Sequence, residues 1–207
     1  MKAIITGDVI NSRQLEKSWL NVLKSALRNQ AASDKYWEIF RGDSFQLQVD
    51  VDEALYAAFY IKASMRTIKN GDIRMGIGIG NVSRQTAKLT EAMGEAFINS
   101  GKAFDQLEEQ KNSLSFVSPD TGFDKLVNLM ISLVLIAADN WSPVMAETVK
   151  IAMENKSLVQ AELATKMSKS QSSVSEALKR AYYQEVMNVD YFYREELNKM
   201  LPIWKSS

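Results

Sequence analysis

The chain contains no cysteine and no histidine among its 207 residues. Without cysteine, disulfide bonds and thiolate metal sites are excluded. Without histidine, Ser-His and Cys-His catalysis and imidazole metal ligands are excluded as well. Any bound metal ion must therefore take oxygen ligands, which favours Mg²⁺, Mn²⁺ or Ca²⁺.

An excess of charge is also missing, because 25 Lys and Arg residues balance 25 Asp and Glu residues. Any nucleic-acid binding must therefore come from a local basic patch. The most apolar stretch, residues 126–138, has about 13 residues, whereas a membrane-spanning helix needs roughly 20. The apolar run before Asp8 is too short for a signal peptide. We expect a cytoplasmic protein with no membrane association, in which residues 126–138 form a buried or interface helix.

Apolar residues in the first half of the chain follow the periods of strands and helices. They predict strands at residues 2–10, 36–40, 45–51, 73–79 and 113–117. Helices are predicted at residues 15–27, 52–70 and 92–109. We expect Asp52 to cap the second helix. The first six elements have the order of the split βαβ of ferredoxin-like folds, so we expect an α+β protein with a ferredoxin-like domain at residues 1–118.

A break in the pattern separates this first part from the rest of the chain. Ser118-Pro119-Asp120-Thr121-Gly122 is typical of a domain boundary. Only helical patterns follow it, at residues 126–138, 141–155, 157–181 and 190–201. The sequence therefore predicts a second, all-α domain at residues 119–207.

Glycines leave one face of the strand at residues 73–79 without side chains. Gly76, Gly78 and Gly80 alternate with Ile77 and Ile79. Such a face lets something approach the backbone closely. The sequence leaves open whether this is a ligand or a packed helix.

Two aspartates are the candidate metal ligands. Asp8 lies near the end of the first strand, and Asp43 lies in the turn of the predicted hairpin. In a split βαβ the first strand is antiparallel to the second hairpin strand, so both carboxylates meet at one end of the sheet. One or two carboxylates together with substrate phosphates are a usual Mg²⁺ site. A turn aspartate that bonds only its own backbone is the structural alternative.

Motifs around the two aspartates resemble those of nucleotide cyclases. Class III nucleotidyl cyclases carry one metal-binding aspartate after the first strand and another in a Gly-Asp hairpin tip, as at Gly7-Asp8-Val9 and Arg41-Gly42-Asp43-Ser44-Phe45. The hairpin also resembles that of GGDEF diguanylate cyclases, and residues 74–80 resemble the glycine strand of class III cyclases. Residues 5–13 and 94–97 resemble the SatD family, and this resemblance extends over nearly the full chain, the helix-turn-helix included.

The resemblance implies a cyclase-like domain that binds a nucleotide through Mg²⁺ or Mn²⁺. Asp8 and Asp43 would hold the metal, and the residues that would contact the nucleotide are Arg13, Arg41, Gly42 and Lys102. The sequence departs from the cyclase pattern in three places. Ile98 occupies the place of a catalytic asparagine, Lys102 occupies that of an arginine, and Ser44 replaces an acidic residue of the GGDEF motif. A lysine is a weaker phosphate clamp than a bidentate arginine, so we expect nucleotide binding rather than efficient cyclisation.

Residues 157–181 are similar to bacterial helix-turn-helix motifs. Two short helices are predicted at residues 157–167 and 170–181, capped by Ser157 and Ser170. The apolar residues of the two helices are spaced to face one another: Leu163, Ala164 and Met167 on the first, and Val174, Ala177 and Leu178 on the second. The positions that match the motif are Gln160, Leu163, Ala164, Ser170, Gln171, Val174 and Ser175.

The second helix of such a motif enters the major groove of DNA. Its expected base contacts are Gln171, Ser172 and Ser175. Its expected phosphate contacts are Lys166, Lys169, Lys179 and Arg180. The alternative is a helix-turn-helix used only for protein contacts. Helices at residues 126–138 and 190–201 are expected to form the seam of a homodimer, with intramolecular packing as the alternative.

Three functions are consistent with these observations. The first is a DNA-binding regulator whose cyclase-like domain binds a metal–nucleotide as a signal. The second is a metal-dependent enzyme that acts on a nucleoside triphosphate and uses the helix-turn-helix for targeting or dimerisation. The third is a structural module whose cyclase-like domain only dimerises.

Overall fold

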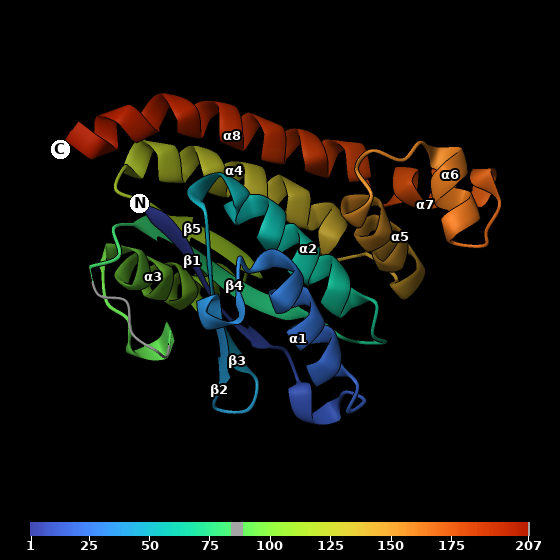
Figure 1. Cartoon of the computed structure of the whole chain (residues 1–207), viewed down its shortest axis with the longest axis horizontal. Helices are drawn as coiled ribbons and strands as arrows, with labels where there is room; N and C mark the ends of the chain where they lie inside the picture. Colours follow the sequence, from blue (N-terminus) through green and yellow to red (C-terminus); the bar gives the residue numbers. More distant parts are fainter. Residues whose placement is uncertain (84–88, 207) are drawn as a thin grey trace.

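The computed structural model describes residues 1–83 and 89–206 as an α+β structure built on a five-stranded mixed sheet (Figure 1). The first elements are β1 (Lys2–Val9), α1 (Trp19–Gln30), β2 (Trp37–Phe40), β3 (Ser44–Val49), α2 (Ala54–Arg66), β4 (Ile73–Gly80), α3 (Glu95–Gln110) and β5 (Leu114–Val117). The helices that follow are α4 (Thr121–Ala138), α5 (Pro143–Glu154), α6 (Gln160–Lys166), α7 (Gln171–Arg180) and α8 (Tyr183–Ser206). The α+β class predicted from the sequence is confirmed.

The strands lie in the order β2-β3-β1-β4-β5. β1 is antiparallel to both of its neighbours, so that Ile5 lies opposite Leu47 on β3 and Ile77 on β4. β2 is antiparallel to β3, and β5 is parallel to β4. The central position of β1 places its last residues between the β2–β3 hairpin tip and the start of β4.

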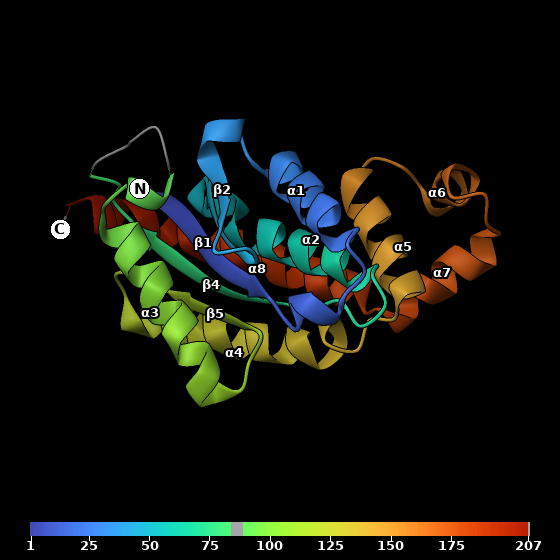
Figure 2. The ribbon, with the colours of Figure 1, turned by 90° about the horizontal axis from the view of Figure 1, so that it is seen from below.

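Helices cover both faces of the sheet. α3 packs on the face that carries the glycines of β4, whereas α1, α2, α4 and α8 contribute to the core on the other face. Figure 2 shows the sheet between α3 on one side and α1 and α2 on the other. The large buried residues of this core include Phe45, Phe59, Phe116 and Tyr193.

The glycine face of β4 is occupied by a helix. A Cβ atom added to Gly78 would lie 2.0 Å from the Ser100 amide nitrogen and 2.4 Å from the Ala96 carbonyl oxygen. Added Cβ atoms at Gly76 and Gly80 would likewise lie 2.4 and 2.6 Å from backbone nitrogens of α3. Of the two alternatives that the sequence left open, close helix packing is therefore the one observed.

One local expectation was wrong, and one helix is longer than expected. Asp52 does not cap α2, because residues 51–53 form a 3₁₀ turn and Glu53 is the N-cap residue, without a side-chain cap bond. The apolar helix predicted at residues 126–138 is longer, since α4 begins at Thr121. The Asp120 side chain caps it by accepting a 2.7 Å hydrogen bond from the Phe123 amide.

The helices beyond residue 118 share the core of the sheet. Phe123 and Val127 of α4, Trp141, and Tyr193 of α8 are buried in one hydrophobic cluster with Phe116 of β5. α6 and α7 belong to a second, smaller cluster of Ala152, Leu163, Ala164, Val174 and Leu178. The division at residues 118–119 stays a prediction: among the described residues α4 and α8 have no core separate from that of the sheet, and α5 contributes to both clusters.

A buried lysine joins the two halves of the chain. The Lys62 side chain on α2 is fully buried, and its Nζ lies 2.9 Å from Asp72 Oδ1 and 2.6 Å from Asp139 Oδ1. It also donates to Ser113 Oγ at 3.0 Å. Beside it, the Arg66 guanidinium donates to Asp72 Oδ2 and twice to the Trp141 carbonyl. This network connects α2 to the residues that precede β4 and β5 and to those that follow α4.

Replacing Gly78 with alanine should lower the free energy of unfolding by about 2–3 kcal/mol, because the new methyl group meets the backbone of α3. The matched control is Gly101→Ala, since a Cβ atom at Gly101 of α3 meets no atom within 4 Å. That control should raise the free energy of unfolding by about 0.5–1 kcal/mol. Urea unfolding measures both, and equal effects would contradict the packing described.

Replacing Lys62 with methionine should lower the free energy of unfolding by about 3 kcal/mol, because two partly buried carboxylates lose their shared cation. Lys2→Met is the control, since Lys2 pairs with Asp50 on the surface, where the two side chains are 42% and 66% exposed, whereas the Lys62 side chain is fully buried. That change should alter stability by less than about 0.5 kcal/mol. Urea unfolding measures both variants. If Lys62→Met lowers the free energy of unfolding no more than Lys2→Met does, the buried network does not stabilise the fold.

Candidate functional sites

The structure places Asp8 and Asp43 at the same end of the sheet. Asp8 of β1 lies opposite Ser44, the first residue of β3, and Asp43 immediately precedes Ser44. The Val9 amide donates a 3.2 Å hydrogen bond to the Asp43 carbonyl. The juxtaposition expected from the hairpin topology is therefore present.

Both aspartates line one open cavity of about 550 Å³. Its floor is the end of β1, and its wall is the loop after that strand, in which Asn11 has a left-handed backbone with φ of 52°. Asparagine adopts this conformation more readily than most residues. The lining residues are Asp8, Val9, Ile10, Asn11, Ser12, Arg13, Gln14, Asp43 and Arg74.

The Asp8 carboxylate is held by an arginine. Arg74 of β4 lies directly opposite Asp8, and its guanidinium donates from Nε to Oδ1 at 3.0 Å and from Nη2 to Oδ2 at 2.6 Å. The Phe104 ring of α3 packs 5.8 Å from the Arg74 guanidinium carbon. Two parallel charge-assisted bonds are the strongest form of this contact, so a metal ion at Asp8 has to compete with a cation already there.

Asp43 ties the hairpin tip to the loop after β1. Its Oδ2 accepts a 2.6 Å hydrogen bond from the Ser12 hydroxyl. Arg41 and Gly42, which precede it, form the tip with left-handed φ values of 52° and 96°. This contact fits either reading of Asp43, because a hydroxyl can support a structural turn or orient a metal-binding carboxylate.

The nucleotide-binding residues expected from the sequence are only partly gathered. Arg13 lines the cavity beside the two aspartates. Arg41, Gly42 and Lys102 do not line it, and the Lys102 residue is exposed on α3. Asn99, next to the place of the cyclase asparagine, is buried and donates to the Ile79 carbonyl at 2.8 Å.

Sequence reasoning missed Arg74 as the partner of Asp8. The residue was visible in the glycine-strand motif, and antiparallel pairing of the first and fourth strands puts it within reach of the end of β1. Over residues 1–83 and 89–206, no group of three or more Asp or Glu side chains is arranged to hold a metal ion. A metal here would thus need phosphate or water oxygens beyond the two carboxylates.

Two short helices with their own small core form the helix-turn-helix. Leu163 and Ala164 of α6 pack against Val174 and Leu178 of α7, as the apolar spacing predicts. The turn passes through Ser168, whose φ is 52°. These helices lie at one end of the molecule, beyond α5 (Figure 1).

The caps of these helices differ. Ser170 caps α7 by accepting a 3.2 Å hydrogen bond from the Ser173 amide, as expected. Ser157 does not cap α6, which begins three residues later after the N-cap Val159. There the Glu162 side chain accepts a 3.0 Å hydrogen bond from the Val159 amide, so the helix start is supported through the backbone of its N-cap residue.

Most of the expected DNA contacts are exposed. Lys166, Gln171, Ser172, Lys179 and Arg180 are open to solvent. Lys169 is different, because its ammonium pairs with Glu147 of α5 at 3.1 Å. Ser175 is half-buried, and the exposed Glu176 follows it on the same helix.

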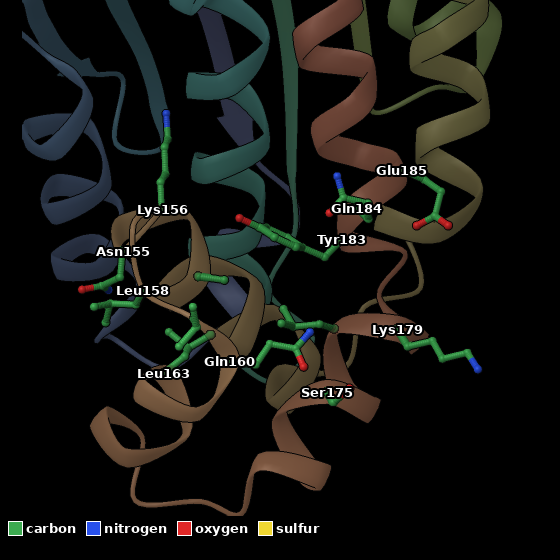
Figure 3. A pocket seen from close by; sticks show the side chains of 13 residues that line it. Asn155, Lys156, Leu158, Gln160, Leu163, Ser175, Lys179, Tyr183, Gln184 and Glu185 are labelled. Atoms are coloured by element: carbon green, nitrogen blue, oxygen red, sulfur yellow. The ribbon is translucent and has the colours of Figure 1, made fainter.

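A groove of about 520 Å³ lies between the end of α5, the helix-turn-helix and the start of α8. Ser175 and Lys179 line its edge. Figure 3 shows the Lys179 side chain extending outward, away from Leu163 and Tyr183. The Lys179 ammonium group is therefore accessible to a partner that does not enter the groove.

No protein-family model matches the chain, and no curated protein matches it.

Proposed function

We propose that this chain is a DNA-binding regulatory protein whose sheet domain binds a metal–nucleotide as a signal. The observation that carries the proposal is α7, a capped helix that packs Val174 and Leu178 against α6 while it exposes Gln171, Lys179 and Arg180. A recognition helix needs a rigid inner face and a polar, basic outer face. DNA is therefore the proposed partner.

The sheet supports the proposed ferredoxin-like assignment, and the proposed kinship to the SatD family and the cyclases rests on the sequence motifs. The strand order β2-β3-β1-β4 with antiparallel neighbours is that of a split βαβ. The motifs at Asp8 and Asp43 lie at one cavity, as the resemblance implies. Mg²⁺ or Mn²⁺ is the proposed ion, because the available ligands are carboxylate oxygens.

Asp8 and Asp43 would hold the ion, and Arg13 would contact phosphate at the same cavity. Arg74 favours a signalling role over turnover, because a metal ion must first replace the Arg74 guanidinium at the Asp8 carboxylate. The freed guanidinium could then donate to a phosphate oxygen beside the same carboxylate. Turnover of a nucleoside triphosphate is the weaker alternative, since Lys102, in the place of the transition-state arginine, does not line the cavity.

The chain is proposed to work in the cytoplasm. Among the residues described, one helix, α4, is long and apolar enough to cross a membrane, and 33% of it is buried in the structure. A single helix of this kind is weak support for a membrane span, because core helices have the same composition.

Nucleoside triphosphates or cyclic dinucleotides with Mn²⁺ should raise the melting temperature. At a ligand concentration 100-fold above Kd the rise should be about 5–10 °C. Asp43→Asn should abolish most of it, because a neutral amide is a poor ligand for Mn²⁺. Asp50→Asn, beyond the far end of β3, is the control and should keep the full rise. An absence of shift with every nucleotide, or the same shift in Asp43→Asn, would refute the nucleotide site.

Duplex DNA should bind with an affinity that falls steeply with salt. The double change Lys179→Ala/Arg180→Ala should reduce the slope of log K against log salt by about 2, since each phosphate contact contributes about 1. Lys199→Ala on α8 is the control, because this exposed lysine pairs with Glu196 away from the helix-turn-helix. Fluorescence anisotropy measures the slopes, and identical slopes for all three proteins would show that α7 does not contact DNA.

A further inference from the structure

Four large apolar side chains form an exposed stripe on α4. Leu126 is 37% exposed, Leu129 and Leu133 are each 60% exposed, and Ile136 is 71% exposed. The opposite side of the same helix buries Phe123, Val127 and Ile131 in the core. Isolated exposed leucines are ordinary, but a contiguous row of them marks an interaction surface.

The spacing of the stripe is that of a helix pair. Its residues are separated by three, four and three positions, which are the a and d positions of a heptad. The stripe runs about 15 Å along the helix. In a pair of such helices each apolar side chain inserts between side chains of the facing helix, so a stripe of this spacing is complementary to a copy of itself.

We propose that α4 pairs along this stripe with the α4 of a second copy of this chain. Two heptads are too few to hold two free peptides together, because the peptides would first have to become helical. α4 is already helical, since its other side is packed on the sheet and Asp120 caps its start. The pairing therefore buries apolar surface without ordering the backbone.

A membrane surface fits the stripe less well. Interfacial helices carry lysines and arginines along their polar face, where they meet anionic headgroups. The charged residues of α4 are Asp124 and Lys125, both near its start, and the rest of the helix has neither sign of charge. The face opposite the stripe is protein core, so spanning a bilayer would require α4 to leave the sheet.

The orientation of the pair follows from the place of the helix-turn-helix, and this step rests on the proposed DNA-binding function. The chain leaves the C-terminal end of α4 toward α5, and Figure 1 shows α6 and α7 beyond that end. Trp141 Nε1 donates to the Ala181 carbonyl at 2.9 Å and ties the two regions together. Parallel α4 helices put both recognition helices at the same end of the dimer, as two half-sites on one DNA require.

The first test is the oligomeric state of the full chain, measured by sedimentation equilibrium without DNA or nucleotide. Wild type should be a dimer, and Leu129→Glu/Leu133→Glu should raise its dissociation constant by on the order of 100-fold, because four carboxylates would be buried in the pair. Ile98→Glu is the control: Ile98 is 61% exposed on α3, on the opposite side of the sheet. It should stay dimeric, and circular dichroism should show that all three proteins are folded.

Three results would overturn the pairing. They are a wild type that is monomeric at about 100 µM, a concentration at which even a weak dimer forms, a double variant that remains dimeric, and dissociation by Ile98→Glu. A monomer that floats with phosphatidylglycerol vesicles through the stripe would make a membrane the occupant. Because the sedimentation experiment contains no DNA, its result tests the pairing of α4 independently of DNA binding.

The second test uses the lack of native cysteine, which makes single cysteines unambiguous. In a parallel pair residue 129 faces its own counterpart, so Leu129→Cys alone should give a disulfide-linked dimer on mild oxidation. In an antiparallel pair residue 129 faces residue 133 instead. Cross-linking only in a mixture of Leu129→Cys and Leu133→Cys proteins would overturn the parallel orientation.

Discussion

The burial of Lys62 is the constraint on which the arrangement of both halves depends. An ammonium group removed from water is strongly unfavourable unless carboxylates and hydrogen bonds surround it. Asp72, Asp139 and Ser113 meet this requirement only when α2, the start of β4, the start of β5 and the end of α4 come together. The Asp72 carbonyl also accepts a hydrogen bond from the Ile10 amide. The same group of residues therefore holds the loop that lines the cavity of Asp8 and Asp43, called the acidic cavity below.

The charged side chains of the acidic cavity and those of the helix-turn-helix differ in whether they already have partners within the protein. In the cavity, opposite charges already satisfy one another: Arg74 neutralises Asp8, and Ser12 bonds Asp43. On α7 the cationic groups of Lys179 and Arg180 are open to solvent. The proposed nucleotide site therefore requires an exchange of partners before it can bind an ion, whereas the proposed DNA-binding surface requires none.

Sequence patterns predicted the parts of the structure that local physics determines. The alternation in residues 45–49 and 73–79 gave the strands, and the hairpin topology gave the meeting of Asp8 with Asp43. The spacing of Leu163, Ala164, Val174 and Leu178 gave the small core of the helix-turn-helix. Two other contacts over long sequence distances were missed, because the Asp8–Arg74 pair depends on the β1–β4 register and the burial of Lys62 depends on the position of α4. The caps failed at Asp52 and Ser157 because the helices begin further along the chain: Glu53 is the N-cap residue of α2, and Val159 is that of α6.

α8 has a mechanical consequence for any signal that passes between the two ends. Its 24 residues form a rod about 36 Å long that starts beside the helix-turn-helix and runs along the length of the molecule (Figure 1). Midway, Arg194 bonds both oxygens of Glu53, and the Tyr193 hydroxyl donates to the Val51 carbonyl at 2.6 Å. The helix is anchored along its length as well, because Val186, Met187 and Leu197 are buried in the core of the sheet and the Trp204 ring lies 5.4 Å from that of Phe123. α8 therefore moves together with the core of the sheet, and a displacement of that core would be carried to the start of α8 beside the helix-turn-helix.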